Sequence, residues 1–292
     1  MQINTGILVI FLIVAGGILV LFLLSSKKYK EFIEPLDPNE YKLKNFLPIG
    51  LYVTELIKYN YGSNYDRRLM AKIIELYGVK YSQYYLRIHW SNKIVLVLMT
   101  AFFLSLFGLS GEPDWDYGIF ALIVLVISFF LPDNELDNKI KERRTSIQLD
   151  FPDFLNKLTL LINAGMTVTR AWEKIVTDSK KDSVLYEELS LTIADIRSGK
   201  PEILAYEDFA KRCKIPEITK FVSVVVQNMK KGNSEMVSIL RLQAAECWEM
   251  RKRTAKRLGE ELSTKLLFPM MIMFMAILII VAAPAIFAMR GM

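Results

Sequence analysis

Reactive and metal-binding side chains are scarce in this 292-residue sequence, which has two cysteines and one histidine. Cys213 and Cys247 stand in helical, charge-rich stretches with no neighbouring cysteine or histidine. That setting predicts reduced, half-buried cytosolic thiols and argues against a disulfide or a metal site. His89 stands beside Trp90 ahead of an apolar run and has no cysteine or serine motif to activate, so an interfacial position is favoured over catalysis.

Motifs for binding nucleotides or metals are also missing. The stretch Ser198-Gly199-Lys200-Pro201 contains a Gly-Lys pair, but a phosphate-binding loop needs a glycine five residues earlier and Ser or Thr after the lysine. Ala194 and Pro201 occupy those places. Five carboxylates are expected on solvated helix faces rather than around a metal: Glu187, Glu188, Asp195, Glu207 and Asp208. The sequence therefore predicts a protein that is not an enzyme, with no catalytic residue, no cofactor and no metal.

Charged residues are absent from four apolar runs, residues 7–24, 94–109, 117–131 and 266–289. The lengths of the first and last runs are close to the ~20 residues that a membrane-spanning helix needs. The two middle runs are shorter and predict a transmembrane hairpin, although a buried hairpin of a soluble protein has a similar pattern. Because transport pathways usually keep charged groups within the membrane, the uncharged runs argue against a proton-coupled transporter.

Charges beside these runs predict the orientation. No basic residue precedes the first run, whereas Lys27, Lys28 and Lys30 follow it. This order is the reverse of a secretory signal and predicts a permanent anchor with its N-terminus outside. The hairpin turn carries only acidic charges, and basic residues crowd the other ends of both runs. The positive-inside rule then places both termini outside, and it accounts for the net charge of +6 without nucleic-acid binding.

The predicted fold class is all-α, a polytopic membrane protein with about four transmembrane helices and a cytoplasmic antiparallel six-helix bundle. The predicted parts are an anchor (7–24), a cytoplasmic connector and helical region (25–92), the hairpin (94–131), the bundle (133–265) and a C-terminal transmembrane helix (266–289). Residues 34–48 contain three prolines and predict an extended connector. Gly78 is expected to break the helix that begins near Tyr65.

The bundle is predicted from apolar stripes separated by glycine turns. Its first helix, with an apolar stripe from Ile147 to Ile162, is expected to have Asp150 as N-cap and Pro152 in its first turn. Thr167 is expected to cap the second helix and Ser234 the sixth, which has no evident end before the last apolar run. The predicted structural turns are Gly165, Gly199 and Gly232.

Five stretches in this order resemble the type II secretion system F domain: LDFPDFLNKLTLLINAGMTVTRAWEKI, LYEELSLTIADIRSGK, AYEDFAKRC, EITKFVSVVVQNMKKGNS and LRLQAAECWEMRKRTAKRLGEELSTKLLFP. The resemblance covers roughly residues 145–290 and rests on apolar positions, turn glycines and the arginine-rich stretch before KLLFP. With its hairpin and C-terminal run, the whole chain is similar to the single-F-domain platform proteins of Tad-type (Flp) pilus machines. This chain departs from many relatives in one place, since it reads MMIMFMAIL where they have a further proline.

The resemblance implies a plasma-membrane platform that passes the work of ATP hydrolysis to pilin assembly. The partners it implies are a hexameric cytoplasmic secretion ATPase, a second F-domain platform protein, pilin subunits and membrane lipid, in a homo- or hetero-oligomer. The alternative from another class is a small membrane transporter or channel subunit with a helical cytosolic domain.

One cluster of charges is a candidate partner contact, and we call it the basic segment: Arg251, Lys252, Arg253, Lys256 and Arg257. On a helix that rises 1.5 Å per residue, it lies roughly 15–20 Å from the membrane entry near Leu266. Two interpretations stay open. The segment is either a solvated face near anionic lipid or a docking surface for an acidic face of the ATPase or a partner subunit.

Overall fold

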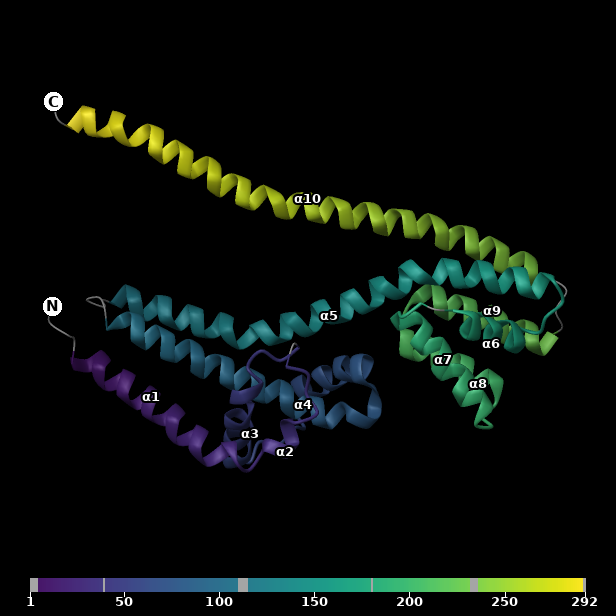
Figure 1. Cartoon of the computed structure of the whole chain (residues 1–292), viewed down its shortest axis with the longest axis horizontal. Helices are drawn as coiled ribbons and strands as arrows, with labels where there is room; N and C mark the ends of the chain where they lie inside the picture. Colours follow the sequence, from purple (N-terminus) through teal and green to yellow (C-terminus); the bar gives the residue numbers. More distant parts are fainter. Residues whose placement is uncertain (1–4, 39, 110–114, 180, 232–235, 291–292) are drawn as a thin grey trace. The chain divides into compact units, whose positions relative to one another are not determined.

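A computed structural model describes residues 5–38, 40–109, 115–179, 181–231 and 236–290, and these residues contain helices and turns but no strand (Figure 1). Four of the helices in this described part of the chain are long and apolar enough to cross a membrane. The all-α fold and the number of such helices confirm the prediction. The chain divides into two compact units, residues 1–142 and 143–292, which we call the N-terminal and C-terminal units.

The N-terminal unit contains α1 (Thr5–Ser26), α2 (Lys30–Ile33), the 3₁₀ turn η1 (Lys44–Phe46), α3 (Leu47–Leu56), α4 (Asn64–Gly108) and the first part of α5 (Trp115–Asn163). A capping box starts α4, in which the Ser63 and Asp66 side chains each accept a hydrogen bond from the other's backbone N–H. Gly78, with φ 77°, interrupts α4 with a kink, as predicted. Gly50 packs so closely on Ser91 of α4 that a Cβ would not fit.

The connector is less extended than predicted. Within residues 34–48, η1 forms one turn, and Leu36 and Leu47 are buried. Both leucines join a cluster with Ile33, Leu51 and Ile88. The three prolines therefore limit helix length here, but burial of apolar side chains against α4 folds the segment onto the unit.

The prediction that a bundle helix starts at Asp150 is wrong. Helix α5 runs without interruption from Trp115 to Asn163, through Pro132 and Pro152. The residues between the second apolar run and Phe151 include many Glu, Lys, Arg and Leu, which have high helix propensity. Extending an existing helix also costs less than nucleating a new one, so the helix continues through this stretch.

In the C-terminal unit, the end of α5 is followed by α6 (Val168–Asp178), α7 (Val184–Arg197), α8 (Glu202–Cys213), α9 (Pro216–Lys231) and α10 (Met236–Arg290). From α6 to α10, each helix packs against the next one in the chain. The core centres on Trp172, which is fully buried and stacks on Tyr206 with ring centroids 5.0 Å apart. Phe154 and Phe209 meet the indole edge-on at 5.0 and 5.1 Å. The predicted apolar stripes supply this core.

Two of the three predicted glycine turns are seen. Gly165 (φ 92°) and Gly199 (φ 97°) adopt the left-handed conformation after α5 and α7. At the first turn, the N–H of Met166 donates to the carbonyl of Leu161 at 3.1 Å. The Thr167 hydroxyl caps α6 by accepting from the N–H of Arg170. Gly232 and Ser234 lie outside the described residues.

Candidate functional site

The basic segment lies along a single helix, α10, in the C-terminal unit. Three of its side chains are well exposed, with 62% of Lys252, 80% of Lys256 and 62% of Arg257 accessible to solvent. The apolar face of α10 that packs into the bundle ends directly before it, at Met250. The segment therefore begins where the helix leaves the core and is open to a partner.

Ion pairs within α10 occupy part of the segment. Lys252 pairs with Glu249 at 3.1 Å, Lys256 lies 3.9 Å from Glu260, and Arg257 lies 3.6 Å from Glu261. Exposed pairs at this spacing each contribute about 0.3–0.5 kcal/mol, so a partner can displace them at little cost. The other two cations differ. The Arg251 guanidinium lies over the Trp248 ring at 5.3 Å, and Arg253 has no ion-pair partner within the described chain.

A groove of about 230 Å³ between α9 and α10 lies just before the segment. Gln243, Cys247 and Met250 line its α10 side, and Glu217 and Lys220 belong to its α9 side. Gln243 is buried, and among the described residues neither its amide nitrogen nor its amide oxygen has a hydrogen-bond partner. One carboxylate oxygen of Glu217 is likewise buried without a hydrogen-bond partner among the described residues. Since buried polar groups normally have partners, this groove can accept polar groups from solvent or a second protein.

The predicted solvated carboxylates include one that is not solvated. Glu188 is largely buried and pairs with Arg143 and Arg212, each at 2.6 Å. The prediction missed this because the two arginines come from distant points of the sequence and meet Glu188 only in the folded bundle.

The lysine of the Gly-Lys pair is held by carboxylates. Lys200 Nζ lies 2.9 Å from both Asp195 and Asp208. Hydrogen bonds from Lys200 and Lys211 lower the pKa of Asp208 to about 2. This geometry gives the lysine a local structural role.

Both thiols are unpaired and buried, more deeply than the half-buried state expected from the sequence. Burial raises the pKa of Cys213 to about 12 and that of Cys247 to about 11, so neither is a reactive thiolate at neutral pH. Over the residues that the structure describes, no three His, Cys, Asp or Glu side chains come together as a metal site.

A charged cluster in the N-terminal unit escaped the sequence analysis. Asp133 accepts hydrogen bonds from Lys93 Nζ at 2.8 Å and from the Tyr65 hydroxyl, and pairs with His89 Nε2 at 2.8 Å. Lys93 is fully buried, with its ammonium also facing the rings of Trp90 and Phe129. Burial alone would raise the pKa of Asp133, but the hydrogen bonds that it accepts hold that pKa well below its ordinary value.

The sequence contained a signal for this cluster. His89 and Lys93 are four residues apart just before the apolar run 94–109, and Asp133 comes just after the run 117–131. In a hairpin of two antiparallel helices, these two ends come together. Considering the two ends together predicts the contact of His89 with Asp133, which His89 considered alone does not.

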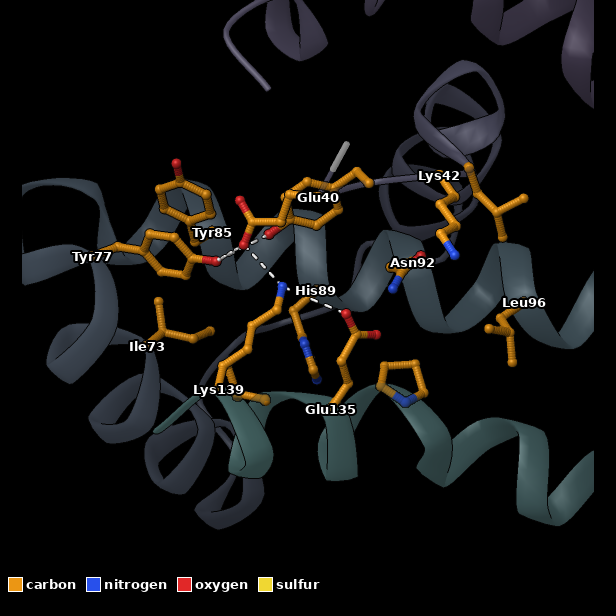
Figure 2. Close-up of a pocket in the computed structure, with 14 residues that line it drawn as sticks. Glu40, Lys42, Ile73, Tyr77, Tyr85, His89, Asn92, Leu96, Glu135 and Lys139 are labelled. Carbon is orange, nitrogen blue, oxygen red and sulfur yellow. Dashed lines mark hydrogen bonds and ion pairs between the residues drawn. The ribbon is translucent and has the colours of Figure 1, made fainter. Parts of the chain in front are cut away.

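Beside this cluster lies a cavity of about 490 Å³, which we call the boundary pocket (Figure 2). Residues 40–43, α4 and α5 form its walls, with Lys42, His89, Asn92, Leu96 and Glu135 among the lining side chains. Lys139 Nζ bridges Glu40 at 2.8 Å and Glu135 at 3.5 Å, and the Tyr77 hydroxyl donates to Glu40 at 2.6 Å. Both signs of charge therefore face one cavity.

Comparison with known families identifies the C-terminal unit. Residues 154–284 match the family described as type II secretion system (T2SS), protein F. The chain carries a type II secretion system F domain. The matched residues include α6–α9, the core around Trp172, the basic segment and the α9–α10 groove. No curated protein and no solved structure matches the chain significantly.

The F domain sets the general class of the protein. This domain is typical of a family of platform proteins of secretion and pilus-type machines, which are generally not catalysts. Together with the four long apolar helices, the F domain indicates an inner-membrane protein that works with other components of such a machine.

Proposed function

We propose that the protein is the non-catalytic platform of a Tad-type pilus or type II secretion-like machine. In this proposal, the F domain is cytoplasmic and both chain termini are outside. A hexameric secretion ATPase acts on the F domain, and the platform passes that work to pilin subunits in the membrane, together with a second F-domain protein. The Tad-type assignment rests on a single F-domain match that follows an apolar hairpin and extends into the C-terminal apolar run.

The observation that carries the proposal is the continuity of α10. Its first turns are part of the bundle core, where Met236, Leu240 and Ala244 are buried. The same helix continues to Arg290 and contains the apolar run that starts at Leu266. The 30 residues before that run span on the order of 45 Å at 1.5 Å per residue. If a partner displaced the bundle, the movement would therefore be transmitted to this apolar run through an unbroken helix.

The basic segment is the proposed contact for the ATPase or a partner subunit. It lies on this same helix, and Arg251 and Arg253 are free of the intrahelical ion pairs that engage its other members. An acidic partner surface would gain charge-assisted hydrogen bonds from these arginines, and long-range attraction would speed the encounter.

Cross-linking in native membranes followed by purification of this protein tests the platform function. The expected result is recovery of a secretion ATPase and a second F-domain protein. Recovery of the protein with only itself, or with a solute-binding partner, would contradict the proposal and favour a transporter.

Charge reversal tests the proposed contact. We expect the double variant Arg253→Glu/Arg257→Glu to insert normally but to lose ATPase recovery and pilus assembly, because it replaces attraction by repulsion. Arg170→Glu/Lys174→Glu is the matched control, since these residues are exposed and four apart on α6. Equal assembly by both variants would show that the basic segment is not the contact.

A further inference from the structure

The boundary pocket lies where two apolar runs end. Leu96, near the start of the run 94–109, lines it, and so does Pro132, which directly follows the run 117–131. A run of this kind ends at the edge of the hydrocarbon layer, where lipid headgroups begin. The pocket is therefore at the depth of the headgroups, with an apolar wall on the side of the acyl chains.

The charges of the pocket match a ligand that carries both signs. Lys42 and Lys139 oppose Glu40 and Glu135, so these four side chains have no net charge. Lys139 is engaged by both carboxylates, whereas within the described chain Lys42 has no ion-pair or hydrogen-bond partner, and neither does the Asn92 side chain. A cation and an amide are thus available for an anionic group.

The carboxylates of the pocket can accept further hydrogen bonds from a ligand. The Glu135 side chain is 57% exposed, and its contact with Lys139 is 3.5 Å long. A carboxylate has about four acceptor sites, so one lysine does not saturate it. Stacked rings of Tyr77 and Tyr85, with centroids 3.6 Å apart, wall the cavity near Glu40 (Figure 2).

We propose that this pocket binds a zwitterionic phospholipid of the phosphatidylethanolamine class. Lys42 and Asn92 bind the phosphate. The carboxylates of Glu135 and Glu40 accept hydrogen bonds from the primary ammonium. The acyl chains extend from the headgroup along Leu96. The site lies outside the F domain and does not depend on the platform function.

This chemistry predicts selectivity among lipids. A choline headgroup has no N–H to donate to the two carboxylates. A glycerol headgroup leaves the phosphate charge unbalanced beside them. Both lipids should therefore bind more weakly than the ethanolamine lipid, even though their acyl chains are the same.

The test uses the full chain, purified in a mild detergent and stripped of lipid. It is incubated with vesicles of equal parts phosphatidylethanolamine, phosphatidylcholine and phosphatidylglycerol, repurified, and analysed by mass spectrometry for bound lipid. We expect the ethanolamine lipid to be enriched on the protein. Lys42→Glu should lower its retention roughly three- to tenfold, since it loses one charge-assisted contact at a partly exposed site.

Two further variants separate specific binding from general effects. Lys80→Glu makes the same charge change at an exposed residue outside the pocket and should retain lipid like the unmodified protein. Glu135→Gln should reduce the preference for ethanolamine over glycerol headgroups, because it removes an ammonium acceptor. Circular dichroism checks that each variant keeps its helices.

Three outcomes would overturn the proposal. The first is bound lipid in the same proportions as the vesicles, and the second is enrichment of the glycerol lipid. The third is an equal loss of lipid in Lys42→Glu and Lys80→Glu. A separate experiment adds soluble phosphoethanolamine to the lipid-bound protein. If it displaces the lipid at equal concentration, the ligand is the free headgroup rather than a membrane lipid, and the proposal is contradicted.

Discussion

At the scale of single residues, Asp133 joins two helices of the N-terminal unit through charge. It belongs to α5, and its partners His89 and Lys93 belong to α4. Lys93 is fully buried, so its ammonium depends on this carboxylate and on the surrounding aromatic rings. A buried ion pair is costly to form, but removing one partner leaves an uncompensated charge in the interior.

We therefore expect Asp133→Ala to destabilise the protein by about 3 kcal/mol, at the low end for a broken buried pair. The control is Asp137→Ala, one turn further along α5, because Asp137 pairs with Lys72 at an exposed position. That change should cost less than about 1 kcal/mol. Chemical unfolding of the detergent-solubilised protein measures both, and equal losses of stability would contradict the assigned role of Asp133.

At the scale of helices and turns, glycines with opposite conformations should respond oppositely to the same substitution. Gly199 has φ 97° and ends α7, whereas Gly259 lies inside the helix α10 with no atom near the position of a Cβ. A left-handed turn needs glycine, while an exposed helix interior favours alanine over glycine.

Gly199→Ala should lower the free energy of unfolding by about 1–2 kcal/mol, because an L-residue is strained in this conformation. Gly259→Ala should raise helix stability by about 0.5–1 kcal/mol. Thermal unfolding followed by circular dichroism compares the two variants. A stabilising effect of Gly199→Ala would show that the turn does not require the left-handed conformation.

At the scale of the whole molecule, the proposed topology places the F domain in the cytoplasm. The native cysteines help to test this placement because both are buried and have raised pKa values of about 12 and 11. Raising the pKa of a thiol lowers the fraction of reactive thiolate at neutral pH. They should therefore give little background in labelling experiments with a maleimide.

We expect a cysteine introduced by Glu187→Cys, at an exposed position of α7, to resist a membrane-impermeant maleimide in intact cells at pH 7. The same cysteine should react after the membrane is permeabilised. Gel shift of the labelled protein gives the readout, with the unmodified chain as control. Labelling in intact cells would place the F domain outside and reverse the proposed topology.

The sequence alone determined the helical class, the four apolar runs, the stripes around Trp172 and the turns at Gly165 and Gly199. These features are local, because periodicity, caps and glycine conformations depend on residues a few positions apart. The F domain was recognisable for the same reason, since its signature is an ordered series of such local patterns.

Only the tertiary structure decided which distant side chains meet. Asp133 lies 44 residues from His89, and Glu188 lies 45 residues from Arg143, so no local pattern links them. The structure also showed that α5 continues past Asp150, where cap and proline signals are weaker than helix propagation. The boundary pocket also depends on contacts between residues that are distant in the sequence. It exists because residues 40–43 fold against α4 and α5, and packing over such separations is decided by the burial of side chains across the whole unit.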